Sequence, residues 1–188
     1  MKVAAFLDAS VLYPSVTRSI LMHLAAFGTY QPLWSDAVHD EWVAALLRNR
    51  PDLSPTRIAR TRALMDAHVN NATVAGFEPL IATLTLPDPN DRHVLAAARH
   101  GGASVIVTAN LKDFPATALA PYNITAEHPH SFISGLIEAE TQSAVAAFAA
   151  DRAAMAKTVM TVAEYLTALE AHDLRHTALE LRTFASEI

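Results

Sequence analysis

The chain has 188 residues, of which 52% are hydrophobic and 18% are charged, and this composition excludes a disordered protein. It has no cysteine, which excludes a disulfide scaffold, a zinc site built on thiolates and a thiol nucleophile. The formal net charge of −5 restricts any contact with nucleic acid to local patches of the surface.

The first third of the chain predicts two short strands, each followed by a helix. Residues 3–7 form an apolar run typical of a buried parallel strand. Apolar residues at helical spacing follow, and Gly28 is expected to end that helix. Residues 32–34 predict a second strand. Ser35 then has the features of an N-cap, and the helix that it begins carries Glu41 near the edge of its apolar face.

The middle of the chain continues this alternation. Ser54-Pro55 is typical of a helix start, because a capping residue precedes a proline at the first helical position. A loop over residues 87–90 leads into a helix over 91–100 that two glycines end. Residues 104–108 are mostly β-branched and predict a strand, and 123–126 predict another. Strands that alternate with helices indicate an α/β fold with a parallel sheet covered on both faces.

The last part of the chain is expected to be helical. Beyond residue 130 there is one glycine and no proline. The predicted helices span residues 130–139, 141–158 and 161–187. The last of them is expected to break near His172-Asp173. Thr161 and Glu164 match a capping box, in which each side chain bonds a free backbone amide of the other residue.

The chain shows no sign of a membrane segment. No apolar run approaches the 18 or so residues of a membrane span. The apolar run near the N-terminus is too short for a signal peptide. Absence of cysteine fits a reducing compartment. We therefore expect a cytoplasmic protein with no membrane partner.

Acidic residues follow the predicted strands or begin the helices between them. Asp8 comes directly after the first strand, and Asp113 follows the strand over 104–108 by five residues. Asp88 and Asp91 lie where the alanine-rich helix begins, and Glu41 lies on an earlier helix. Polar groups beyond the carboxyl ends of parallel strands converge on one crevice. Such a cluster is tolerated mainly when cations neutralise it, and ligands that are all oxygen favour Mg²⁺ or Mn²⁺.

Each of these acids also has a purely structural interpretation. An Asp after a strand often forms a turn or caps a helix. Asp91 at a helix start is favoured by the helix dipole alone. Glu41, taken by itself, is an ordinary solvated charge. The functional interpretation therefore depends on the whole set and its order.

That set, in that order, resembles the PIN domain, the fold of metal-dependent ribonucleases that includes VapC-type toxins of bacterial toxin–antitoxin pairs. The matching segments are Phe6-Leu7-Asp8-Ala9-Ser10, Glu41 on the helix opened by Ser35-Asp36, residues 88–98, residues 107–114, and the closing turn at 128–132. The resemblance covers about residues 1–135. It implies a PIN-like three-layer α/β/α domain with a parallel sheet over 1–135, and it leaves 136–188 as a helical C-terminal extension.

The resemblance also assigns roles to residues. Its acidic quartet corresponds to Asp8, Glu41, Asp91 and Asp113. Of these, Asp8, Asp91 and Asp113 are expected to bind Mg²⁺ (or Mn²⁺), and Glu41 to bind metal or to orient the attacking water. Asp88 competes with Asp91 for the third position. We prefer Asp91, because the alanine-rich helix follows it directly, and we keep Asp88 as an additional candidate ligand.

Three polar residues match supporting positions of the same family. Ser10 resembles the small polar residue beside the first Asp, although many members carry Asn there. Thr108 and Asn110 resemble the polar groups at the end of the strand. Some branches of the family carry an acid at the position of Asn110, so the amide lowers the negative charge of this site.

The function implied by the resemblance is metal-dependent endoribonuclease activity on RNA phosphodiesters, as the toxin of a type II toxin–antitoxin pair. An antitoxin protein and a homodimer are the partners that it implies. A PIN-fold module without catalysis, which binds RNA or protein, is the alternative, and the intact quartet argues against it. A phosphohydrolase with an aspartyl-phosphate intermediate needs a second Asp two residues after Asp8, where Ser10 stands.

A cluster of arginines is the candidate RNA-binding surface. Its members are Arg48, Arg50, Arg57, Arg60 and Arg62. The guanidinium group binds phosphate with a rigid fork of donors, so the cluster is suited to the RNA backbone or to an acidic partner. A solvated face of a helix explains the same pattern equally well.

Overall fold

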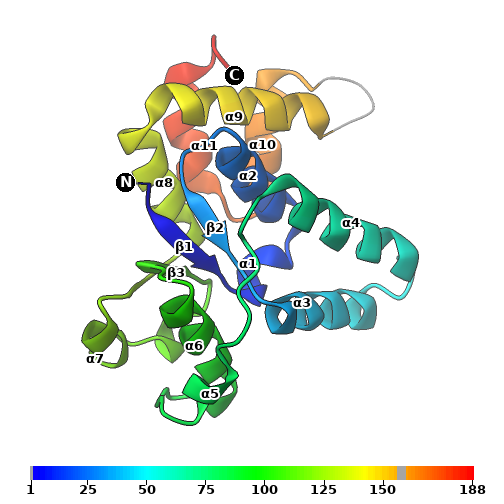
Figure 1. Ribbon diagram of the computed structural model, residues 1–188. Helices are drawn as coiled ribbons and strands as arrows, with labels where there is room; N and C mark the ends of the chain where they lie inside the picture. Colours follow the sequence, from blue (N-terminus) through cyan, green and yellow to red (C-terminus); the bar gives the residue numbers. More distant parts are fainter. Residues whose placement is uncertain (1, 156–159) are drawn as a thin grey trace. The chain divides into compact units, whose positions relative to one another are not determined.

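The computed structural model describes residues 2–155 and 160–188, and its elements pack into two compact units (Figure 1). The first unit comprises Met1–Tyr13 and Gln31–His128, and the second comprises Pro14–Tyr30 and Pro129–Ile188. The expected boundary between residues 1–135 and 136–188 stays a prediction.

A four-stranded parallel sheet forms the centre of the first unit. Its strands are β1 (Ala4–Leu7), β2 (Gln31–Leu33), β3 (Val105–Val107) and β4 (Thr125–Glu127). Their order is β2-β1-β3-β4, and every neighbouring pair is parallel. β1 is central, and its residues Ala5, Phe6 and Leu7 are fully buried, as a purely apolar strand requires. The prediction of an α/β fold with a parallel sheet is confirmed.

Helices surround this sheet in the first unit. They are α1 (Ala9–Leu12), α3 (Asp36–Asn49), α4 (Pro55–His68), α5 (Glu78–Ile81), α6 (Arg92–His100) and α7 (Ala116–Leu119). Short 3-10 turns lie at Pro89–Asp91, Leu111–Asp113 and Ala120–Tyr122. α6 packs against β1 and β3 through five buried residues, Val94 to Ala98. The Ser35 side chain caps α3 by accepting a hydrogen bond from the Val38 amide, as predicted.

The second unit is entirely helical within its described residues. Its helices are α2 (Ser15–Ala26), α8 (Pro129–Ala139), α9 (Thr141–Ala154), α10 (Val162–Ala171) and α11 (Arg175–Leu181), followed by a 3-10 turn at Arg182–Phe184. α2 lies along α9 (Figure 1). Residues 156–159, which include the predicted end of the helix over 141–158, lie outside the described residues.

The predicted helix signals in this unit are confirmed. Thr161 and Glu164 form the capping box that begins α10, with both backbone amides bonded. The break between α10 and α11 falls at Asp173, whose φ of 60° cannot continue a right-handed helix.

A buried carboxylate joins three helices of the second unit. Asp151 on α9 is fully buried and accepts hydrogen bonds from the hydroxyl of Ser19 on α2 and from that of Tyr165 on α10, the latter at 2.7 Å. The Nδ1 atom of His23 lies 3.1 Å from the same carboxylate. The hydrogen bond to Asp151 is the main cause that raises the pKa of His23.

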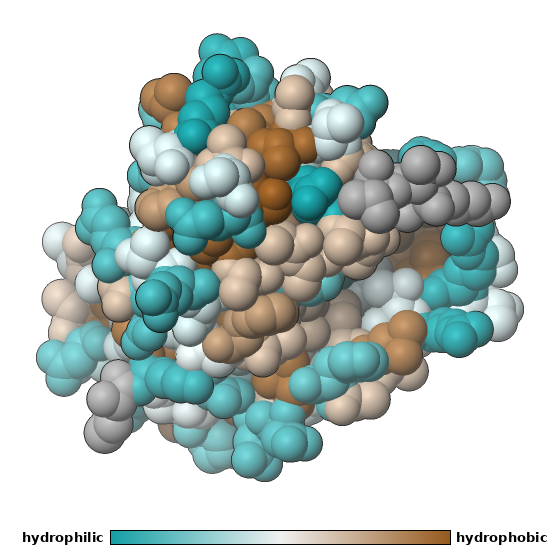
Figure 2. Space-filling view, turned by 90° about the horizontal axis from the view of Figure 1, so that it is seen from above, coloured by the Kyte–Doolittle hydropathy of each residue, from teal (hydrophilic) through white to brown (hydrophobic). Residues whose placement is uncertain are grey.

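In the face of the molecule shown in Figure 2, tan and brown residues are most frequent toward the middle and teal residues toward the rim. Scattered apolar residues are normal on a protein surface. Among the residues that the structure describes, no helix has the length and the apolar content that a membrane crossing requires.

Replacing Asp151 tests this junction. Asp151→Ala leaves the buried Tyr165 hydroxyl without its acceptor, so we expect the free energy of unfolding to fall by about 3 kcal/mol. Tyr165→Phe removes a single bond and should cost roughly 1–2 kcal/mol. Urea denaturation followed by circular dichroism measures both. Glu138→Ala, which removes an exposed carboxylate of the same unit, serves as the control. An Asp151→Ala midpoint equal to that of the control would contradict this assignment.

Candidate active site

The pairing of β1 with β3 places Asp8 beside Thr108. The Asp8 amide donates to the Val107 carbonyl at 3.1 Å, so both strands end at the same level. The hydroxyl of Thr108 then donates to the Asp8 carboxylate at 2.9 Å. Asp8 is 8% exposed and Thr108 is fully buried. The carboxylate therefore has one defined orientation at the carboxyl edge of the sheet.

Ser10 completes the support of Asp8. Its hydroxyl donates to Asp8 Oδ2 at 2.6 Å and accepts a hydrogen bond from the Ala109 amide at 3.0 Å. The Asn110 amide donates to Thr108 Oγ1 at 3.0 Å, and the Asn110 side chain donates to the Asp113 carboxylate. The three polar residues predicted as supporting groups thus contact the acids that follow β1 and β3.

The pKa of Asp91 is affected by the other acids of this region. Burial, followed by the charges of four other acids, raises the pKa of Asp91 to about 6. In decreasing order of effect these acids are Asp8, Asp88, Asp113 and Glu41. The other four acids named from the sequence therefore all lie within electrostatic reach of Asp91.

Asp88 and Asp91 differ in what their side chains do locally. The Asp88 carboxylate accepts a hydrogen bond from the Asn90 amide at 2.8 Å and so caps the 3-10 turn Pro89–Asp91. The Asp91 side chain makes no capping hydrogen bond to α6. The structural interpretation as a cap thus applies to Asp88, while the carboxylate of Asp91 is not used in this way.

His93 is a site residue to which the sequence assigned no role. Its Nε2 atom lies 2.8 Å from the Glu41 carboxylate and links α6 to α3. Burial by itself lowers the pKa of His93. The hydrogen bond and charge of Glu41 outweigh burial, with smaller contributions from Asp8 and Asp91, so the pKa of the ring is raised. Its position two residues after Asp91, at the start of the same helix, was the available signal.

The donor set suits a hard divalent cation. Asp8, Asp91 and Asp113 offer only carboxylate oxygens, and the mutual repulsion seen at Asp91 is what a cation would relieve. Over residues 2–155 and 160–188, no three acidic or histidine side chains are already arranged around one ion. Three of the acids contact protein partners. Asp8 is bonded to Ser10 and Thr108, Asp113 to Asn110, and Glu41 to His93.

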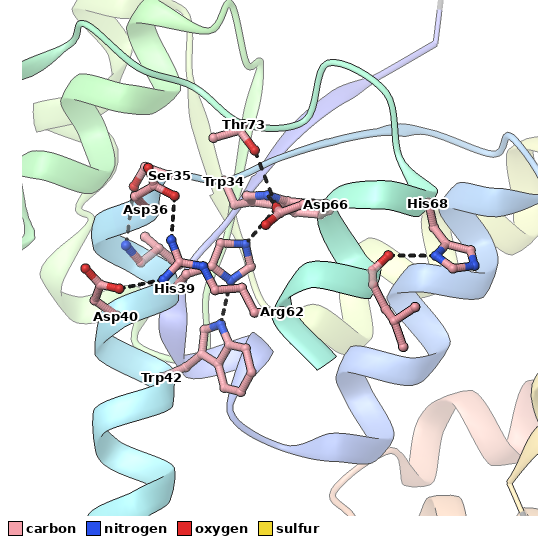
Figure 3. Close-up of polar contacts among 12 residues, drawn as sticks. Trp34, Ser35, Asp36, His39, Asp40, Trp42, Arg62, Asp66, His68 and Thr73 are labelled. Atoms are coloured by element: carbon pink, nitrogen blue, oxygen red, sulfur yellow. Dashed lines mark hydrogen bonds and ion pairs between the residues drawn. The ribbon is translucent and has the colours of Figure 1, made fainter. Parts of the chain in front are cut away.

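The arginines of the cluster differ in their surroundings. Arg50 binds Asp52 with two hydrogen bonds of 2.8 and 2.7 Å. Arg62 reaches from α4 to Asp36 and Asp40 on α3, as Figure 3 shows. Arg57 and Arg60 are exposed on α4. Arg48 lines a groove that also contains Ser10 and Glu41.

Comparison with known proteins agrees with this geometry. A family model described as PIN domain matches residues 4–112, which is more than half of the chain. This chain belongs to the PIN-domain family. A second family model, described as VapC50 C-terminal domain, matches residues 129–183 of the same PIN-domain protein.

One curated relative of this PIN-domain protein carries the name "Putative ribonuclease VapC50" and comes from Mycobacterium tuberculosis. The two are 49% identical over 65 residues, which cover 35% of this chain and 38% of the relative. The match thus spans well under half of the relative's length. No solved structure matches the chain.

The raised pKa of Asp91 predicts a stability cost for the wild-type protein without metal. A carboxylate whose pKa is raised in the folded state opposes folding at every pH above that pKa. Asp91→Asn should therefore raise the free energy of unfolding at about pH 8 by ~1 kcal/mol, because solvent around the half-buried group screens the full effect.

This gain should shrink as the pH falls below about 6, where folded wild-type Asp91 takes up a proton, and it should vanish near the ordinary pKa of 3.8. Urea denaturation in chelator at several pH values measures it. A destabilised Asp91→Asn protein at high pH would show that Asp91 holds the fold together instead of being strained in it.

Proposed function

We propose that this protein is an endoribonuclease that depends on Mg²⁺ or Mn²⁺ and that it serves as the toxin of a type II toxin–antitoxin pair. The observation that carries the proposal is the placement of Asp8 and Asp113 beside the carboxyl ends of β1 and β3, where Thr108 and Asn110 bond them. The repulsion that raises the pKa of Asp91 supports it, because Asp8, Glu41 and Asp113 come from three other segments of the chain. A fold that keeps such repulsion in place favours a function that needs the charge.

In this proposal each acid has a distinct task. Asp8, Asp91 and Asp113 hold the metal, and Ser10 and Thr108 fix the direction of the Asp8 carboxylate. A bound divalent cation would supply charge neutralisation at phosphorus and a more acidic water as the nucleophile.

Glu41 is suited to orient the attacking water, because its contact with His93 fixes its carboxylate at the edge of the acidic cluster. The contact with Glu41 raises the pKa of His93 and so favours the protonated ring beside the acids. Asp88 completes the turn that presents Asp91. No covalent enzyme intermediate is expected.

Cleavage of mixed single-stranded RNA tests this function. Wild-type protein should cut in Mg²⁺ or Mn²⁺ and should be nearly inactive in chelator, because uncompensated carboxylates repel the phosphate backbone. Asp8→Asn should lower the rate by roughly a thousandfold. The measurement is the initial rate of fluorescently labelled RNA cleavage.

Glu138→Gln, prepared in the same way, is the matched control because it removes an exposed carboxylate outside the acidic cluster. Cutting that persists in Asp8→Asn would mean a contaminating nuclease or a different site. No cutting by wild-type protein under any of these conditions would favour the alternative, a PIN-fold module that binds RNA or protein without catalysis.

The toxin role is supported by the matches to the VapC50 C-terminal domain and to a relative named as a ribonuclease. Induced expression of the wild-type chain in a bacterial host should stop growth, and Asp8→Asn should not. An antitoxin partner and a homodimer are further parts of this proposal. Light scattering of the purified protein would show whether it is a dimer.

A further inference from the structure

A groove of about 680 Å³ opens beside the acidic cluster within the first unit. It lies along α1 and α3, and it shares Ser10 and Glu41 with the acidic cluster. Its other walls come from Tyr13, Trp42, Arg48, Asn49 and three alanines. Grooves of roughly 300–1,000 Å³ are the usual size for a site that takes one small organic group.

Arg48 gives this groove a positive charge. Arg50 is neutralised by Asp52, and Arg62 by two acids of α3. Among the residues that the structure describes, no carboxylate pairs with Arg48, which lines the groove seven residues after Glu41. A guanidinium without a protein partner next to a cluster of acids is suited to an anion that must approach those acids.

The aromatic groups of the groove have different tasks. Trp42 is only 1% exposed, so it can form a wall but cannot offer its face to a base. Its Nε1 atom donates to His39 Nδ1 at 2.9 Å (Figure 3). His39 Nε2 lies 3.3 Å from Asp66. Burial lowers the pKa of His39 and so favours the neutral ring, which is the form that can accept a hydrogen bond on Nδ1. This hydrogen bond holds the Trp42 indole in one position.

Tyr13 is the second aromatic side chain that lines the groove. It is half-buried at the end of α1, and its hydroxyl accepts a hydrogen bond from the Asn49 side chain at 3.2 Å. That bond holds the phenol ring at the groove. Unpaired bases bind proteins by stacking on such rings, with a gain that depends little on sequence.

We infer that this groove holds the nucleotide next to the scissile phosphate of a single-stranded RNA, with its phosphate at Arg48 and its base at Tyr13. The inference rests on the proposed function, because RNA is the ligand and the acidic cluster is where it is cut. It adds the location of substrate binding, and it separates Arg48 from the rest of the arginine cluster. A duplex is excluded as the ligand, since its bases stay stacked on one another.

Binding is measured separately from cleavage so that the two hypotheses can fail independently. Asp113→Asn protein is expected to leave RNA uncut, and fluorescence anisotropy gives its Kd for a labelled RNA of mixed sequence and roughly ten nucleotides. In this background, Arg48→Ala and Tyr13→Ala should each weaken binding about tenfold. Arg99→Ala, an exposed arginine of α6 that does not line the groove, should leave the Kd unchanged.

Salt dependence distinguishes the two contacts. Loss of one phosphate contact lowers the slope of log Kd against log salt by about 0.7 for a single strand, so Arg48→Ala should change the slope and Tyr13→Ala should not. Arg48→Lys should restore the slope, and Tyr13→Phe should restore the affinity because it keeps the ring. These conservative variants also show that the loss does not come from misfolding.

In otherwise wild-type protein that cuts RNA, Arg48→Ala should raise KM about tenfold and change kcat less than twofold. Unchanged Kd and salt slope in both Arg48→Ala and Tyr13→Ala would overturn the subsite while the cleavage result stands. Weakened binding in these variants, together with no cleavage by wild-type protein, would keep the subsite and overturn the nuclease. Loss of binding in Arg99→Ala equal to that in Arg48→Ala would also overturn the subsite.

Discussion

Parallel pairing of β1 with β3 is the constraint on which the site depends. Parallel strands end at a common edge of the sheet, so the residues that follow neighbouring strands lie side by side there. Asp8 and Thr108 are those residues, and one hydrogen bond of 2.9 Å joins them. The segments that follow, with Ser10 on one and Asn110 and Asp113 on the other, are then brought within reach of each other. Asp8 and Asp113, which are far apart in the sequence, are in this way brought to the same edge of the sheet.

The short distance between these carboxylates lowers the free energy of unfolding. Carboxylates that repel one another raise the free energy of the folded chain, and the pKa of Asp91 makes this visible. The buried β1 residues and the Val94 to Ala98 face of α6 supply apolar contacts that offset the cost. His93 reduces it further by meeting Glu41. The site is thus a strained region supported by a well-packed sheet.

Much of this arrangement was predictable from the sequence. The strands predicted over residues 3–7 and 104–108 and the helices that begin after Ser35 and Ser54 depend on local patterns. The structure has these elements, with the strands at Ala4–Leu7 and Val105–Val107, although the Ser54 side chain makes no capping hydrogen bond. Parallel topology brings the ends of β1 and β3 together, and with them Asp8 and Asp113. Local sequence patterns do not show which long side chains of different helices or strands contact each other. The contact of His93 with Glu41 and the pairing of Arg62 with Asp36 depend on helix packing, which has no periodic signature.

The grouping of α2 with residues 129–188 has a consequence for synthesis of the chain. During translation Ser15–Ala26 leaves the ribosome more than a hundred residues before α9, the helix along which α2 packs. The apolar residues Ile20, Leu21 and Leu24 of α2 are buried in the complete protein. They belong to a helix that cannot pack against α9 until α9 has been synthesised. If synthesis stopped after His128, α2 would therefore lack α9, the helix against which it packs. A prematurely ended chain of this protein would expose apolar side chains of α2 to solvent and would be a substrate for chaperones and proteases.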